Sequence, residues 1–293
     1  MTLQSEPQMG RSLWHDAWLV LRRNRAAMVS LMLLVLLTAA VLIVPLVSTH
    51  TVDETDWAFM SVSPGFSHGH WFGTDGLGRD LLVRTFYGGR ISLLVGVVAT
   101  LVSLIIGITY GAVSGYVGGR VDQFMMRAVD ILYALPFMFL VILLMVFFGR
   151  NIFLIFIAIG AINWLDMARI VRGQTLSLKH REFIEAARAG GVTMPKIIWR
   201  HVVPNLMGVV VVYVTLTIPQ VILVESFLSF LGLGVQEPMT SWGALVNEGA
   251  QEMESAPWLL VFPAAFLTLT LFCFNFLGDG LRDALDPRDR NAP

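Results

Sequence analysis

The stretch ISLLVGVVATLVSLIIGITYGAV, residues 91–113, contains 23 residues and no charged side chain. A helix needs about 20 apolar residues to cross the hydrocarbon layer of a membrane, with a range of about 17–25. The stretch therefore predicts a transmembrane helix. Five further uncharged apolar runs lie at 26–47, 131–148, 152–165, 206–224 and 258–277. The run 152–165 is short, with 14 residues, and has to extend at one end or be shielded among other helices. We expect an all-α integral membrane protein with six transmembrane helices.

The composition of the chain supports this class. Of the 293 residues, 56% are hydrophobic and 14% are charged, and the mean hydropathy is +0.70. Soluble domains have about 45–50% apolar and about 25% charged residues, so an ordinary soluble enzyme is excluded. The net charge of −1 provides no basic field for nucleic acid. The single cysteine, Cys273, excludes an intrachain disulfide, and neither of the two lysines closes a phosphate-binding loop, so we expect no ATP site of that kind.

Lys and Arg are unevenly distributed between the two sides of the six predicted helices. With six spans, the two termini lie on the same side of the membrane. The segments on that side hold sixteen Lys and Arg, whereas the segments on the opposite side hold four. Cytoplasmic loops carry an excess of basic residues. We therefore expect both termini to be cytoplasmic.

Small residues and prolines predict how the spans pack and bend. A ridge of small residues occupies every fourth position of the second span: Ala99, Ser103, Gly107, Gly111, Gly115 and Gly119. Such ridges let helices approach closely in lipid, so we expect packing within this chain or, alternatively, against a partner subunit. Pro136 and Pro219 each remove an intrahelical hydrogen bond, and we expect kinks there.

The longest segment on the basic side, 166–205, contains TLSLKHREFIEAARAGG at 175–191. Apolar residues such as Phe183 and Ile184 alternate there with charged ones at helical spacing, and two glycines follow. This pattern predicts an exposed amphipathic helix that ends at the glycines. Most connections between elements have about 4–6 residues, so a segment of this length is a candidate docking surface. A merely solvated surface helix is the alternative.

The letters EAARAGG in this stretch, followed later by a proline, resemble the EAA motif of ABC importer permeases. The usual motif has Ile and Leu where the present chain has His201 and Val203. In that family the short helix docks on a cytoplasmic ATPase, so the resemblance implies a coupling helix at about 175–195. The residues that carry the motif are Glu185, Ala186, Ala187, Gly191 and Pro204.

Three further stretches are similar to the C-type permease subunits of oligopeptide and dipeptide importers: FGTDGLGRDLLVRTFYGGRISL (72–93), LSFLGLGVQEPMTSWGAL (228–245) and GDGLRDALDPR (278–288). The start of the chain and the region of Asp56 fit the oligopeptide member best. The resemblance implies a type I ABC importer permease fold in a bacterial inner membrane, with both termini inside. The implied function is oligopeptide import, in which this chain forms half of the translocation pathway; dipeptide, glutathione and nickel importers share the same frame.

The resemblance also implies partners and an organisation. The partners are a second permease subunit of B type, two cytoplasmic ATPases that bind ATP and Mg, and a periplasmic peptide-binding protein. This chain itself would bind no cofactor. In chain order, the parts would be a cytoplasmic tail (1–25), a first transmembrane helix (26–47), a periplasmic segment (48–90), the ABC importer transmembrane domain (91–280) and a second cytoplasmic tail (281–293).

Other candidate sites carry little signal. His68 and His70 form an HxH pair in the outer segment, but no third ligand has matching spacing, so we expect a solvated pair and no metal site. The glycine-rich GTDGLG at 73–78 lacks the strand–helix context of a nucleotide loop and predicts a turn. All six histidines lie outside the predicted spans, and HExxH and GxSxG are absent. An intramembrane protease is therefore excluded, and we predict no catalytic residue.

The fifth predicted span contains the candidates for a translocation path. It carries Pro219 and Gln220, and Glu225 follows directly after its apolar part. Ionisable groups at membrane depth are functional by default. We expect these three residues to line the path, with structural pairing as the alternative for Glu225. The competing class, a stand-alone secondary transporter, needs ionisable residues at the midplane, and the other five spans contain none.

Overall fold

The structure, a computed structural model, describes residues 13–66, 68–148 and 152–285. Over these residues the protein is helical throughout, and the only β-type pairing among them is an isolated bridge between Thr74 and Asp80. The helices are α1 (Leu13–Arg23), α2 (Arg25–Val47), η1 (Trp57–Phe59), α3 (Leu81–Val117), α4 (Gly119–Ala134), α5 (Phe137–Phe148), α6 (Ile152–Leu178), α7 (Glu182–Ala189), α8 (Met194–Ile197), η2 (Ile198–Val202), α9 (Val203–Phe230), α10 (Trp242–Gln251) and α11 (Trp258–Leu285).

Four helical segments of the described chain are long and apolar enough to cross a membrane. They are α2, α3, the continuous run α8–η2–α9 and α11, and the pair α4–α5 makes a fifth if it is taken as one bent span. The short fourth run of the sequence, 152–165, forms the first half of α6, which packs along α3. The all-helical membrane class is thereby confirmed, with four or five spans identified by length and composition.

Helix α3 is longer than the apolar run that predicted it. It begins at Leu81 because Asp80 caps it: Oδ1 of Asp80 accepts a hydrogen bond from the Val83 amide at 2.9 Å. The helix has 37 residues, or about 55 Å at the α-helical rise. Its first turns therefore belong to the segment that the sequence assigned to the outer side.

The ridge of small residues on α3 packs against α6 of the same chain. A methyl group at Gly107 would lie 2.5 Å from Met167 Cβ, and one at Gly115 would lie 2.8 Å from the Arg172 carbonyl oxygen. Packing within this chain is therefore confirmed for these positions. Gly119 at the end of the ridge has nothing within 4 Å and does not take part.

The two prolines behave differently. Pro136 separates α4 from α5, and the two helices meet at 83°, so the predicted kink is a full break of the third apolar run. Pro219 lies inside α9, which runs from Val203 to Phe230 as one helix.

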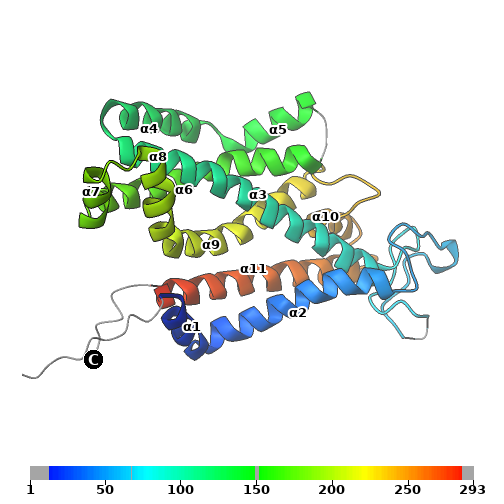
Figure 1. The fold of residues 1–293 in the computed structure, drawn as a ribbon. Coiled ribbons are helices and arrows are strands. Elements are labelled where there is room, and N and C mark those ends of the chain that lie inside the picture. The colour runs from blue at the N-terminus through cyan, green and yellow to red at the C-terminus, as the bar shows by residue number, and fades with distance from the viewer. Residues whose placement is uncertain (1–12, 67, 149–151, 286–293) are drawn as a thin grey trace, which may run out of the picture.

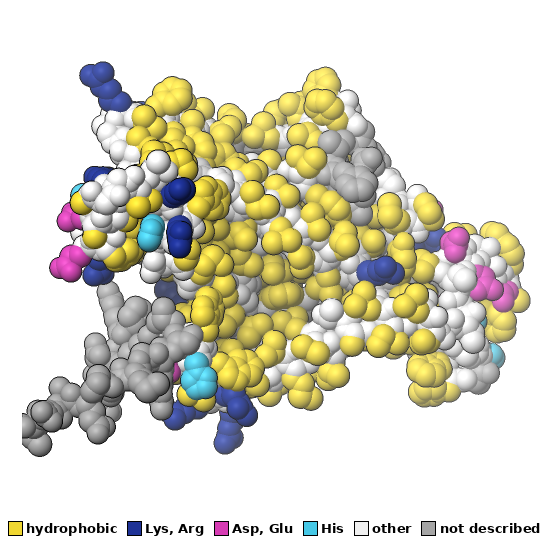
Figure 2. Space-filling model, viewed as in Figure 1, with side chains coloured by type: hydrophobic (Ala, Val, Ile, Leu, Met, Phe, Trp, Pro, Cys, Tyr) yellow, Lys and Arg dark blue, Asp and Glu magenta, His cyan; other side chains and the backbone are white. Residues whose placement is uncertain are grey.

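The helices place two groups of segments at opposite ends of the molecule (Figure 1). Helices α1, α7 and α8 and the last turn of α11 lie at one end, here called the α7 end. Helix α10 and the segment around η1 lie at the other, the α10 end. Figure 2 shows a largely hydrophobic surface between the ends, with charged side chains gathered mainly toward them. The predicted tails 1–25 and 281–293 extend into 1–12 and 286–293, which lie outside the described residues.

Candidate functional site

Helix α7 contains the EAA letters and is terminated by its two glycines. The Val192 amide donates to the Ala187 carbonyl at 3.1 Å, and the Gly191 amide donates to the Arg188 carbonyl at 3.0 Å. These two bonds form a Schellman motif, which satisfies the last carbonyls of the helix. Gly191 has a φ of +77°, a conformation that a side chain with a Cβ disfavours. The predicted end of the helix is confirmed.

One apolar side chain fixes α7 to the rest of the molecule. Ile184 is completely buried. Its cluster draws residues from α3, α6 and the α8–η2–α9 run: Ile108, Ala112, Tyr116, Met167, Val171, Ile197, Ile198, Val202, Leu206 and Val210. This short helix is thereby anchored to three long helical segments, α3, α6 and α8–η2–α9.

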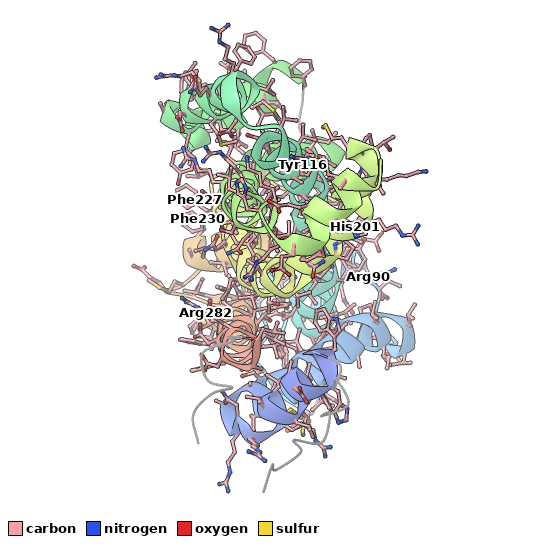
Figure 3. All side chains as sticks on the ribbon, turned by 60° about the vertical axis from the view of Figure 1, so that its left-hand side comes forward. Arg90, Tyr116, His201, Phe227, Phe230 and Arg282 are labelled. Atoms are coloured by element: carbon pink, nitrogen blue, oxygen red, sulfur yellow. The ribbon has the colours of Figure 1, made fainter. Side chains whose placement is uncertain are left out.

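The opposite face of α7 is open. Glu185 and Ala186 are exposed, and the small side chain of Ala186 leaves room for another surface to approach, whereas Ala187 is half-buried and packs against the Ile184 cluster. Figure 3 turns the α7 end forward and labels Tyr116, over whose ring the Arg188 guanidinium lies at 5.5 Å. Pro204 is also exposed, but it lies in the first turn of α9, away from α7 along the chain.

Glu225 lies in the interior near the α10 end. Ser92 of α3 donates to its Oε2 at 3.1 Å, and Ser229 donates to its Oε1 at 2.7 Å. Ser92 Oγ also accepts the Trp242 amide at 3.2 Å, and Ser241 Oγ lies 3.2 Å from Ser229 Oγ. The carboxylate thus joins α3 and α9 to the beginning of α10.

The three path candidates do not share a surface. Pro219 is buried, Gln220 is exposed, and Glu225 has no exposed area. Of these three residues only Gln220 has an exposed side chain. The hydrogen bonds of Glu225 agree with structural pairing, the alternative to a path role for this residue.

A network of ion pairs holds the α10 end together, and no pattern in the sequence predicts it. Arg84 is only 2% exposed, and its guanidinium contacts Glu248 at 2.8 and 3.1 Å and Asp75 at 2.5 Å. Arg79 bonds Glu237 at 2.8 Å and holds the pKa of that carboxyl below its ordinary value. The partners lie up to 164 residues apart, so no local pattern could reveal them.

Asp75 also organises the GTDGLG segment. Its Oδ1 accepts the amides of Leu77 and Arg79, both at 2.9 Å, which is the geometry of an Asx turn. The predicted turn is confirmed. The prediction that the two histidines of the HxH pair are solvated is confirmed for His68, which is exposed. It is wrong for His70, which is buried against Asp80.

Comparison with known proteins identifies the family. The profile described as "Binding-protein-dependent transport system inner membrane component" matches residues 107–291, which include α7 and α9. The chain belongs to this family. A second profile, the "N-terminal TM domain of oligopeptide transport permease C", matches residues 12–64 of the permease.

Individual relatives agree over nearly the whole length. The permease is 63% identical over 281 residues to the "Oligopeptide transport system permease protein OppC" of Escherichia coli K12, covering 96% of this chain and 93% of the relative. It is 47% identical over 279 residues to the Bacillus subtilis protein of the same name, covering 95% and 91%. The "Dipeptide transport system permease protein DppC" of Bacillus subtilis is 48% identical over 280 residues, covering 95% and 87%.

These matches establish the permease as an inner-membrane component of a transport system that depends on a binding protein. Its relatives are transporter permease subunits.

Proposed function

We propose that the permease imports oligopeptides and forms half of the translocation pathway together with a second permease subunit of B type. Two cytoplasmic ATPases bind ATP and Mg, and a periplasmic binding protein delivers the peptide. The 63% identity to the oligopeptide permease of Escherichia coli supports this cargo. The 48% identity to a dipeptide permease supports dipeptides as the second candidate.

The proposed topology has six spans and cytoplasmic termini. Helix α6 supplies a span beyond those identified by length and composition, and the bent pair α4–α5 supplies another. The charge distribution supports this orientation, because the side of the two termini holds sixteen of the twenty Lys and Arg. The α7 end is then cytoplasmic and the α10 end periplasmic.

Single cysteines test this orientation. In a chain with Cys273 replaced by alanine, Ser63→Cys and Ser255→Cys place thiols at exposed positions of the α10 end, and Ser177→Cys places one at the α7 end. We expect an impermeant thiol reagent to label the first two in intact spheroplasts and the third only after lysis. Labelling of Ser177→Cys alone in intact spheroplasts would contradict the orientation.

Helix α7 is the proposed contact with an ATPase, and its burial pattern is the observation that carries the proposal. Ile184 is buried among the long helices, while Glu185 and Ala186 face outward. Movement of a docked ATPase would reach α3, α6 and α9 through one rigid contact. Gly191 and Pro204 lie on either side of the connecting segment. Gly191 ends α7, and Pro204 lies at the start of α9.

Charge reversal on α7 tests the docking. We expect Glu185→Lys to weaken ATPase association and to lower uptake about tenfold, since it replaces one carboxylate on the contact face by an ammonium group and an unfavourable charge pair costs on the order of 1–2 kcal/mol. Co-purification of the ATPases and peptide uptake in membrane vesicles measure both effects. Glu254→Lys, an equal change at the exposed α10 end, is the control. Full uptake and normal co-purification of Glu185→Lys would refute the assignment.

The path is proposed to run along the exposed side of α9 at Gln220. Peptides carry polar amides that lose several kcal/mol per unsatisfied group in an apolar environment, so the path must offer polar contacts. Pro219 has no amide hydrogen, so one backbone hydrogen bond of α9 is missing beside Gln220. Glu225 supports the path indirectly, because its hydrogen bonds hold α9 against α3 and α10.

Removal of the amide group tests the path. We expect Gln220→Leu to raise the KM for peptide uptake about 2- to 10-fold, the effect of losing one neutral hydrogen bond of about 0.5–1.5 kcal/mol. Gln123→Leu makes the same change at an exposed position of α4 and should leave KM unchanged. An unchanged KM in Gln220→Leu would remove this face of α9 from the path.

A further inference from the structure

Three potential metal ligands meet in the segment between α2 and α3. His50 follows the end of α2, His70 lies in the loop before the GTDGLG turn, and Asp80 caps α3. Each residue offers one ligand atom, and the three atoms lie within 4.8 Å of one another. The sequence separates them by up to thirty positions, which is why the HxH pair alone predicted no site.

Two of the three side chains are held firmly in place. His70 and Asp80 are 3% and 4% exposed, and Nδ1 of His70 lies 2.8 Å from Oδ2 of Asp80. The His70 carbonyl accepts the amides of Gly65 and Gly73 at 3.1 and 3.0 Å. The other oxygen of Asp80, Oδ1, accepts the Val83 amide in the first turn of α3. This part of the cluster is preorganised.

His50 completes the group from the solvent side. Its ring centroid lies 4.7 Å from that of His70, and its backbone amide donates to Ser48 Oγ at 3.1 Å. An ion pair between a protonated His70 and Asp80 would explain those two residues without His50. The His50 ring beside this pair adds a second imidazole nitrogen to the group.

We propose that His50, His70 and Asp80 form a binding site for a divalent transition metal, with Zn²⁺ as the best fit. Imidazole nitrogens and a carboxylate oxygen are ligands that zinc prefers, at bond lengths of about 2.0–2.2 Å. Tetrahedral bonds of that length bring ligand atoms to roughly 3.3–3.6 Å from one another. The half-buried His50 therefore has to move inward, and His70 Nδ1 and Asp80 Oδ2, which lie 2.8 Å apart, have to separate by roughly 0.5–0.8 Å.

A bound metal would join the end of α2 to the start of α3. These two helices are neighbours in the membrane, but a loop of 33 residues separates them in the chain. The metal would close this loop at its base and order the segment between. It is thus proposed as a structural staple at the α10 end, independent of the cargo and of the ATPases.

Metal titration of the purified transporter tests the proposal. The complex is stripped with a chelator, and Zn²⁺ bound after equilibrium dialysis is measured by elemental analysis; Co²⁺ absorption in the visible range reports the ligand geometry. His50→Gln and Asp80→Asn remove ligands, and asparagine remains a good helix cap, so that α3 still starts normally. His68→Gln is the matched control, since His68 is an exposed histidine two positions from His70.

We expect the unaltered complex to bind one more Zn²⁺ than His50→Gln, and each of the two ligand variants to bind this ion at least tenfold more weakly. We also expect Zn²⁺ to raise the unfolding temperature of the unaltered complex and of His68→Gln, but not of His50→Gln. Equal zinc content and affinity in the unaltered complex and His50→Gln would overturn the site. An equal loss in His68→Gln would do the same, because it would show that binding does not depend on this geometry.

Discussion

Ile184→Ala is expected to stop peptide uptake while the ATPases still bind. The side chain is fully buried between α7 and the ends of α3, α6 and α9, and truncating such a residue costs about 2–5 kcal/mol. Helix α7 has eight residues, too few to be stable without packing, since isolated helices shorter than about 12–15 residues are marginal. The exposed face that carries Glu185 would remain, but its connection to the spans would be loose.

The expected result is a fall in uptake of at least tenfold with ATP hydrolysis retained. Uptake and ATPase activity of the same membrane vesicles measure the two quantities together. Phe183→Ala is the matched control, because Phe183 is 43% exposed on the neighbouring face of α7 and should affect uptake much less. Coupled uptake at the normal rate in Ile184→Ala would show that α7 does not transmit motion through this contact.

The second large effect is expected at the α10 end. Arg84→Met removes the buried guanidinium from Asp75 and Glu248, which keep only Arg79 at 2.6 and 3.9 Å, and breaking a buried ion pair costs about 3–5 kcal/mol. Thermal unfolding of the purified transporter should therefore begin at a distinctly lower temperature. Arg169→Met is the control: its partner Asp130 is 60% exposed, and surface pairs contribute about 0–1 kcal/mol.

A double variant separates a lost contact from an uncompensated charge. Adding Glu248→Gln to Arg84→Met removes the carboxylate that keeps only a 3.9 Å contact with Arg79 and should restore part of the stability. If Arg84→Met unfolds at the same temperature as Arg169→Met, the buried network does not stabilise the α10 end.

Regular periodicity and local chemistry made much of the fold predictable. Uninterrupted apolar runs locate α2, α3 and α11, because a helix in lipid has to satisfy its backbone groups internally. The glycine pair after the EAA letters predicts the end of α7, since a positive φ is required there. The Asx turn at Asp75 follows from the same kind of local signal.

The remaining features depend on residues that are distant in the chain. After the bend at Pro136, α5 packs on α6, a contact that no window around the proline contains. Glu225 looked like a path residue because its carboxylate follows an apolar run, yet Ser92, 133 positions away, supplies a hydrogen bond in the interior. The neighbours of His70 were missed for the same reason, because Asp80 and His50 lie in other segments of the chain.

The continuous helix from Met194 to Phe230 has a mechanical consequence. Its 37 residues make a rod of about 55 Å, with the short π-helical segment confined to the end near α7. Pivoted near its middle, such a lever converts a tilt of 5° into opposite displacements of roughly 2–3 Å at its two tips. In the proposed topology, a push at the tip next to α7 would therefore arrive at the serine-bound carboxylate and α10 with the reverse sign. Closing one mouth of the proposed pathway and opening the other would be, for this helix, a single movement.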